Sequence, residues 1–188
     1  MAQFSTMREF ILSKGQIIIS VRRAVALEMN LCESLNRRCH PTKAKDFLVA
    51  ISWLGDGKVW YALIFILPLL YGNSGLATSY SLIKVAVVNL LLYKVIKGLT
   101  GRHRPCMVCS NITLETVPLD QYSFPSGHTM HAVAFSMVIV AHHPEFFCLL
   151  LPFCILIALS RVVLGLHYPT DVIAGGVIGG YVASVLSA

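Results

Sequence analysis

Five apolar runs fill most of the chain after residue 57, at 58–73, 76–96, 127–141, 146–159 and 169–187. With 56% hydrophobic and 13% charged residues, the chain has too little charge to cover the surface of a soluble domain. In lipid, backbone polar groups must be satisfied within the spanning structure, which leaves helices or closed barrels. The runs do not alternate polar and apolar residues as barrel strands do. The sequence therefore predicts an all-α integral membrane helical bundle with about five transmembrane helices.

The first 45 residues differ from the rest because basic and apolar side chains are interleaved there at helical spacing. A spanning helix needs about 20 apolar residues, and Arg22 and Arg23 would lie in the middle of one. The pattern is typical of an amphipathic helix that lies in the membrane interface, and we expect Pro41 to end it. We therefore divide the chain into an N-terminal interfacial segment, 1–45, and a transmembrane core, 46–188. The basic residues of the interfacial segment are Arg8, Lys14, Arg22, Arg23, Arg37, Arg38, Lys43 and Lys45.

The formal net charge of +6 raises the question of an acidic partner. The basic residues lie beside membrane segments, so we expect anionic lipid headgroups as partners and no nucleic acid. Cys106 and Cys109 form a Cys-x-x-Cys pair, but no second Cys or His pair with zinc spacing accompanies it. The sequence therefore predicts no zinc or redox centre.

Four glycines in the last apolar run, Gly175, Gly176, Gly179 and Gly180, make two overlapping Gly-x-x-x-Gly pairs. Small residues let helix backbones approach closely in lipid. Such a face either forms a homodimer or packs tightly within the bundle, and we favour packing within the bundle.

Three polar segments stand at the ends of apolar runs: 97–105, 125–128 and 160–171. If each run crosses the membrane once, all three emerge on the same face and form one site. Three of their side chains, Lys97, Arg104 and Arg161, are positively charged. Charges at membrane depth are costly and usually functional, and arginine and lysine both suit phosphate oxygens.

The segment Pro125-Ser126-Gly127-His128 is typical of a helix N-terminus, with Ser126 as its cap. Free backbone N–H groups and the helix dipole favour an anion at such a place, and Gly127 lets the backbone approach it closely. The three cations, Ser126 and Gly127 together predict a phosphate-binding site.

His167 lies four residues before Asp171, with Pro169 at a first helical position between them. Asp171 can accept the Nδ1 hydrogen of His167 and leave Nε2 as a nucleophile. His128, at the other helix start, is placed to protonate a leaving alkoxide. No carboxylate cluster stands in these segments to hold Mg²⁺, so we expect phosphoryl transfer through a phosphohistidine without metal or cofactor.

The three segments resemble the signatures of the type 2 phosphatidic acid phosphatase family. These are Lys97 followed after six residues by Arg104-Pro105, then Pro125-Ser126-Gly127-His128, then Ser160-Arg161 with His167 and Asp171. The resemblance covers about 75 residues and implies a lipid phosphatase, acting on phosphatidic acid, phosphatidylglycerophosphate or an isoprenyl diphosphate. It implies His167 as nucleophile, His128 as acid and then base, and Asp171 as the orienting group. It also implies that Lys97, Arg104, Ser126, Gly127 and Arg161 bind phosphate.

The chain departs from the commoner six-span members of that family, because an interfacial N-terminus stands where a first span would be. The basic residues before residue 46 favour a site on the cytoplasmic side by the positive-inside rule. The family resemblance implies an outward, periplasmic site in a cell inner membrane.

Three other activities are open to the same residues. A vanadate-dependent haloperoxidase has a similar phosphate site but is soluble, so the apolar runs argue against it. A lipid phosphotransferase would pass the phosphate to a second lipid instead of water. A lipid-binding scaffold with a dead site conflicts with the intact set of His128, His167 and Asp171.

Overall fold

The computed structural model describes the backbone of residues 2–118 and 120–187, with the side chains of residues 20, 22–118 and 120–187. Within these ranges the regular elements are helical, as predicted, and the only β pairing is an isolated bridge between His103 and Tyr122. The helices are α1 (Ala2–Cys39), α2 (Lys43–Leu54), α3 (Lys58–Tyr71), α4 (Asn73–Thr100), α5 (Pro105–Val108), α6 (Gly127–His142), α7 (Phe147–Val163) and α8 (Pro169–Leu186), with a short 3₁₀ turn at Pro144–Phe146.

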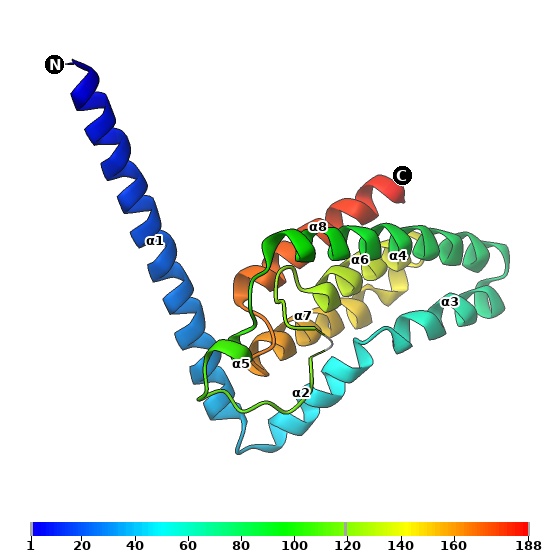
Figure 1. Ribbon diagram of the computed structural model, residues 1–188. Helices are drawn as coiled ribbons and strands as arrows, with labels where there is room; N and C mark the ends of the chain where they lie inside the picture. The colour runs from blue at the N-terminus through cyan, green and yellow to red at the C-terminus, as the bar shows by residue number, and fades with distance from the viewer. Residues whose placement is uncertain (1, 119, 188) are drawn as a thin grey trace.

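Helices α4, α6, α7 and α8 run alongside one another and form a bundle, which α3 flanks (Figure 1). The most extensive helix contact joins α6 to α8. Trp60, Leu82, Phe135, Ile139 and Ile157 are among the fully or almost fully buried core side chains. The outward faces are apolar as well: Phe65 is 74% exposed and Leu69 is 83% exposed. Apolar side chains on the outside are what a lipid environment favours, so the bundle fits a membrane protein.

Within the part of the chain that the structure describes, two helical segments, Pro144–Val163 and Pro169–Leu186, are long and apolar enough to cross a membrane. Helices α2 and α3 would make a third span if their 53° bend lies within one crossing. Helix α6, with 16 residues, measures about 24 Å, shorter than a ~30 Å hydrocarbon core. Helix α4 carries Lys84, Lys94 and Lys97, and several asparagine, serine and threonine residues also interrupt its apolar sequence. The expected count of five spans is therefore not confirmed, although the helices themselves lie where the apolar runs predicted them.

Helix α1 runs steeply across the direction of the bundle, and its N-terminal part extends away from it (Figure 1). It ends at Cys39, two residues before Pro41, as expected. In its C-terminal half Arg22 and Arg23 are exposed, whereas Cys32 is fully buried. Arg8 and Lys14 belong to a stretch whose side chains lie outside the described residues. The interfacial location of segment 1–45 stays a prediction.

The glycine face of α8 lies against α6. A Cβ added at Gly175 would come within 2.5 Å of the Ser126 carbonyl oxygen, and one at Gly179 within 2.1 Å of the Met130 carbonyl oxygen. The neighbours of Gly176 and Gly180 are also α6 side chains, at 3.4–3.9 Å. The close backbone approach that these glycines permit is therefore used within the bundle.

The six cysteines, Cys106 and Cys109 included, are all free thiols. Burial is the main cause that raises the pKa of Cys32 to about 12. A thiol with so high a pKa is a poor nucleophile, and the Cys32 thiol donates a hydrogen bond to the carbonyl of His167 at 3.7 Å.

Candidate active site

The three polar segments meet at one end of the bundle. The backbone N–H of Ser126 donates a hydrogen bond of 2.9 Å to the carbonyl of Asp171, which joins the start of α6 to the start of α8. Arg104 donates through NH1 to the carbonyl of Leu166 at 2.9 Å, which joins the segment after α4 to the loop between α7 and α8. Segments that lie far apart in the chain, 62 residues in the case of Arg104 and Leu166, thus meet at one site.

His167 is held by a tight turn that follows α7. Gly165 adopts a left-handed conformation with φ +68°, which costs glycine little. The N–H groups of Leu166 and His167 both donate to the carbonyl of Arg161 at 3.0 Å. The turn therefore fixes the His167 backbone against the last turn of α7, and His167 as a whole is only 1% exposed.

The contacts of the His167 ring indicate its tautomer. NH1 of Arg104 lies 3.0 Å from Nε2 of His167. A guanidinium only donates hydrogen bonds, so Nε2 is the acceptor and the ring hydrogen sits on Nδ1. Nδ1 faces Oδ2 of Asp171 at 3.7 Å, which exceeds hydrogen-bond length. Asp171 therefore faces Nδ1 of His167 as expected, but the two atoms are too far apart for a hydrogen bond.

His167 is electrostatically held in its neutral form. Full burial, reinforced by the positive charges of Arg161 and Arg104, keeps the pKa of His167 well below the usual histidine value. A neutral imidazole with its lone pair at Nε2 is the form that a nucleophilic histidine requires.

A carboxylate that the sequence reasoning missed, Asp120, lies among the cations. Its Oδ2 accepts from Nζ of Lys97 at 2.8 Å and from the hydroxyl of Tyr93 at 2.9 Å. Its Oδ1 accepts from NH2 of Arg104 at 3.1 Å. Partial burial opposes ionisation, but the hydrogen bonds from Lys97 and Tyr93 lower the pKa of Asp120 to about 2. Asp120 is thus an anion at the place where two expected phosphate ligands converge.

Arg161, the third expected phosphate ligand, is 5% exposed and reaches towards α2, where its NH1 hydrogen-bonds the hydroxyl of Ser52. Its Nε has no partner within the described part of the chain. A buried donor without a partner is costly, so this N–H is available to an anion.

The start of α6 is as predicted, with Ser126 at the N-cap position, but the expected capping bond is absent among the described contacts. The Ser126 hydroxyl instead pairs with the hydroxyl of Thr129 at 3.0 Å. At Gly127 an added Cβ would lie 2.7 Å from the ring of Tyr93. In this structure the absence of a side chain at Gly127 therefore leaves room for the aromatic ring of Tyr93.

His128, in the first turn of α6, is paired by a second carboxylate outside the three segments. Its Nε2 makes a close contact with Oδ1 of Asp56, a residue in the break between α2 and α3. Both line a cavity of about 470 Å³ between α3, α4 and α6, whose walls also include Trp60, Tyr93 and Phe135. The expected general acid thus stands at the polar end of a mainly apolar cavity.

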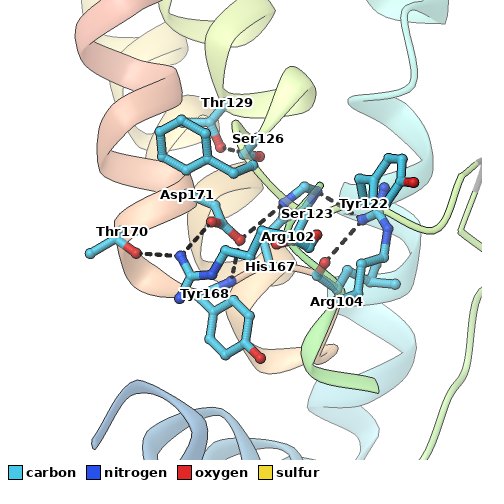
Figure 2. A network of polar contacts seen from close by, with 12 residues as sticks. Arg102, Arg104, Tyr122, Ser123, Ser126, Thr129, His167, Tyr168, Thr170 and Asp171 are labelled. Atoms are coloured by element: carbon cyan, nitrogen blue, oxygen red, sulfur yellow. Dashed lines mark hydrogen bonds and ion pairs between the residues drawn. The ribbon is translucent and has the colours of Figure 1, made fainter. Parts of the chain in front are cut away.

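Arg102, also outside the expected set, supports Asp171. Its NH1 donates to Oδ1 of Asp171 and to the hydroxyl of Thr170, each at 2.8 Å (Figure 2). The backbone N–H of Tyr168 donates to Oδ2 of Asp171 at 2.8 Å. Both carboxylate oxygens of Asp171, which is 0% exposed, therefore have hydrogen-bond donors.

Residues 76–188 match the PAP2 superfamily. The lipid A 1-phosphatase of Rhizobium etli is 29% identical over 84% of this chain and 77% of its own length. The undecaprenyl-diphosphatase of Sulfolobus acidocaldarius is 28% identical over 72% of this chain and 66% of its own length.

Two solved structures have the same fold. The first transmembrane PAP2 type phosphatidylglycerolphosphate phosphatase from Bacillus subtilis superposes with a TM-score of 0.72 and 23% identity, covering 87% of this chain and 84% of that one. LpxE of Aquifex aeolicus gives a TM-score of 0.68 and 24% identity, covering 85% and 94%.

Proposed function

The chain belongs to the PAP2 superfamily and is a membrane lipid phosphatase, and we propose that it works through a phosphohistidine at His167. The observation that carries this proposal is the 3.0 Å contact from Arg104 to Nε2 of His167. Because the Arg104 N–H donates to Nε2, the contact indicates that the Nε2 lone pair faces the group of cations that would bind the phosphate. In the reaction Nε2 forms a bond to phosphorus, and the bond from phosphorus to the lipid oxygen breaks.

Each expected site residue then has a role. Lys97, Arg104 and Arg161 balance the charge on the phosphoryl oxygens, with the backbone at Ser126 and Gly127 beside them. Asp171 stabilises the imidazolium as phosphate adds to His167. His128 gives a proton to the departing lipid oxygen and later takes one from the attacking water.

The position of His128 supports a lipid as the leaving group. The acid must lie beside the oxygen that departs, and His128 lines the cavity between α3, α4 and α6. We therefore place the lipid body in this cavity, against Trp60 and Phe135, with its phosphate towards His167. By their names, the relatives act on lipid A, on undecaprenyl diphosphate and on phosphatidylglycerol phosphate, all of which join an apolar body to a phosphate.

We propose that the reaction needs no metal ion. Among the residues that the structure describes, no three His, Cys, Asp or Glu side chains gather to hold one. The developing negative charge already faces Lys97, Arg104 and Arg161, which can replace a metal ion as charge stabilisers. Activity should survive excess chelator and be inhibited by vanadate; loss in chelator that Mg²⁺ restores would contradict this.

A phosphate-release screen in detergent tests the activity, with phosphatidic acid, phosphatidylglycerophosphate, isoprenyl diphosphate and lipid A as substrates. The control is His167→Ala, which should abolish release and any covalent phosphoenzyme. Transfer of labelled phosphate to a second lipid would show a phosphotransferase, and release that persists in His167→Ala would overturn the proposed nucleophile.

We place the site on the outward face of a cell inner membrane, as the family resemblance implies. His40 and Glu115 pair at 2.8 Å, so cysteines introduced at positions 40 and 115 should label from the same side. An impermeant thiol reagent, applied to a background without the native cysteines, should label both from outside. Labelling of both only after lysis would place the site in the cytoplasm, as the positive-inside rule predicts.

A further inference from the structure

Arg102 has four contacts that the chemistry above does not explain. Besides Asp171 and Thr170, its NH2 donates to Oε2 of Glu28 at 2.7 Å, and its guanidinium lies 3.8 Å from the centre of the Tyr168 ring. Figure 2 shows the Arg102 side chain reaching Asp171 and Thr170 at the start of α8, above the Tyr168 ring. Three of these contacts are with Tyr168, Thr170 and Asp171, which follow the nucleophile directly in the chain, and the fourth is with Glu28.

Glu28 comes from α1, far from the site in sequence. Its Oε2 accepts from Arg102, and its Oε1 accepts from the backbone N–H of Thr170 at 2.8 Å. Thr170 is the second residue of α8, so its N–H has no partner within its own helix. Glu28 therefore fixes both the guanidinium and the first turn of α8, and its side chain is only 15% exposed.

These contacts converge on the orientation of the Asp171 carboxylate. Arg102 holds Oδ1, and the Tyr168 N–H holds Oδ2, the oxygen that faces Nδ1 of His167. Arg102 is itself 24% exposed, and a long side chain with that access to solvent has many alternative rotamers. The carboxylate of Glu28 selects the rotamer that reaches Asp171.

We propose that Glu28 and Arg102 are positioning residues for the phosphatase reaction, so that the packing of α1 against the bundle sets the geometry of the His167–Asp171 pair. The inference rests on the proposed role of His167. Helix α1 is then part of the active enzyme and not only an attachment to the membrane surface.

The test is the rate of the covalent step in full-length variants in detergent. Glu28→Gln keeps the size of the side chain and removes its charge. We expect kcat for p-nitrophenyl phosphate and the rate of phosphohistidine formation to fall about 10-fold, because hydrogen bonds between charged groups are worth more than neutral ones. KM should change less than twofold, since Glu28 does not touch the phosphate ligands.

The matched control is Glu33→Gln. Glu33 lies on the same helix and accepts from Asn111 at 3.0 Å and from Cys109, with no recorded contact to Arg102 or Asp171. It should keep wild-type kcat. If both variants lose activity alike, or if Glu28→Gln retains wild-type kcat, Glu28 is a structural contact of α1 and the proposal is wrong.

The double variant Glu28→Gln/Arg102→Lys tests whether Glu28 affects kcat through Arg102 or independently of it. If Glu28 acts through Arg102, the double variant should lose no more kcat than Arg102→Lys alone. Losses that multiply would mean that Glu28 acts by another route. If the wild-type enzyme forms no phosphohistidine at all, the proposed function fails instead, whatever the variants show.

Discussion

The carboxylate of Asp120 lies 2.8 Å from the ammonium of Lys97 and 3.1 Å from NH2 of Arg104. Its two oxygens therefore take positions on these cations that phosphate oxygens would take. A phosphate that binds here must displace Asp120 or share the cations with it. We therefore expect the loop before α6 to weaken anion binding by competition.

Replacement of Asp120 by Asn should strengthen inhibition by vanadate. The Asp120 side chain is 32% exposed, and ion pairs with this access to solvent are worth ~1 kcal/mol, which corresponds to about fivefold in the inhibition constant. The control is Glu115→Gln in the same loop, whose partners are His40 and Lys45; it should leave inhibition unchanged. Weaker vanadate inhibition in Asp120→Asn would show that Asp120 instead holds Lys97 and Arg104 in place for phosphate.

The lowered pKa of His167 predicts how the covalent step depends on pH. A histidine that is neutral in the folded protein loses its lone pair only when pH falls below its own depressed pKa, not below the ordinary value. With an ordinary pKa near 6.5, the neutral fraction would fall about threefold between pH 7 and pH 6. We expect phosphohistidine formation from p-nitrophenyl phosphate to change by less than that in rapid alkaline quench. A threefold fall would indicate an ordinary histidine.

The lowered pKa of His167 also predicts how the folding stability depends on pH. Below about pH 6.5 the unfolded chain binds a proton at His167 that the folded chain refuses, so folding stability falls as pH drops.

The contact between α8 and α6 predicts different effects at two adjacent glycines. In Gly175→Ala the new methyl would meet the Ser126 carbonyl at 2.5 Å, whereas in Gly176→Ala it would lie 3.8 Å from the Val133 side chain. Overpacking of this kind costs about 1–3 kcal/mol, and here it also displaces the start of α6. Gly175→Ala should lower both the melting temperature in detergent and kcat, and Gly176→Ala should resemble wild type.

Equal tolerance of both glycine substitutions would mean that α6 and α8 are farther apart than the structure shows. A change of oligomeric state in Gly176→Ala alone would instead indicate a homodimer at that face.

Much of the helix pattern was predictable because polar or turn-forming residues separate the apolar runs. The expected runs 127–141 and 169–187 correspond to α6 (Gly127–His142) and α8 (Pro169–Leu186). The three polar segments stand where these helices begin or end, so their meeting at one end of the bundle also followed from the sequence.

The carboxylates around the site were not predictable in this way. Asp56 lies in a helix break, Asp120 in a loop, and Glu28 on α1, most of which extends away from the bundle (Figure 1). Their roles depend on which cation or histidine the fold brings within 3 Å or so, and spacing along the chain carries no signal of that distance. A charge count near the cations offers a partial signal, because buried cations need counter-ions and the three polar segments supply only Asp171.

The two histidines should be separable by the step that each one limits. Loss of the acid should slow a natural lipid substrate, whose alkoxide leaves poorly, by ~10²–10⁴-fold. p-Nitrophenyl phosphate needs little protonation, so His128→Ala should still form phosphohistidine from it. The second step lacks its base in this variant, and the intermediate should persist. Alkaline quench and mass spectrometry of the peptide containing His167 would detect it.

Asp56→Asn gives a milder version of the same test. Asp56 contacts Nε2 of His128 and no described atom of His167, so its loss should disturb the acid and leave the nucleophile intact. We expect turnover of the lipid to fall about 10-fold and formation of phosphohistidine from p-nitrophenyl phosphate to stay near the wild-type rate. Equal loss with both substrates would place Asp56 in phosphate binding instead. Phosphate found on His128, or label retained in His167→Ala, would mean that the roles of the two histidines are reversed.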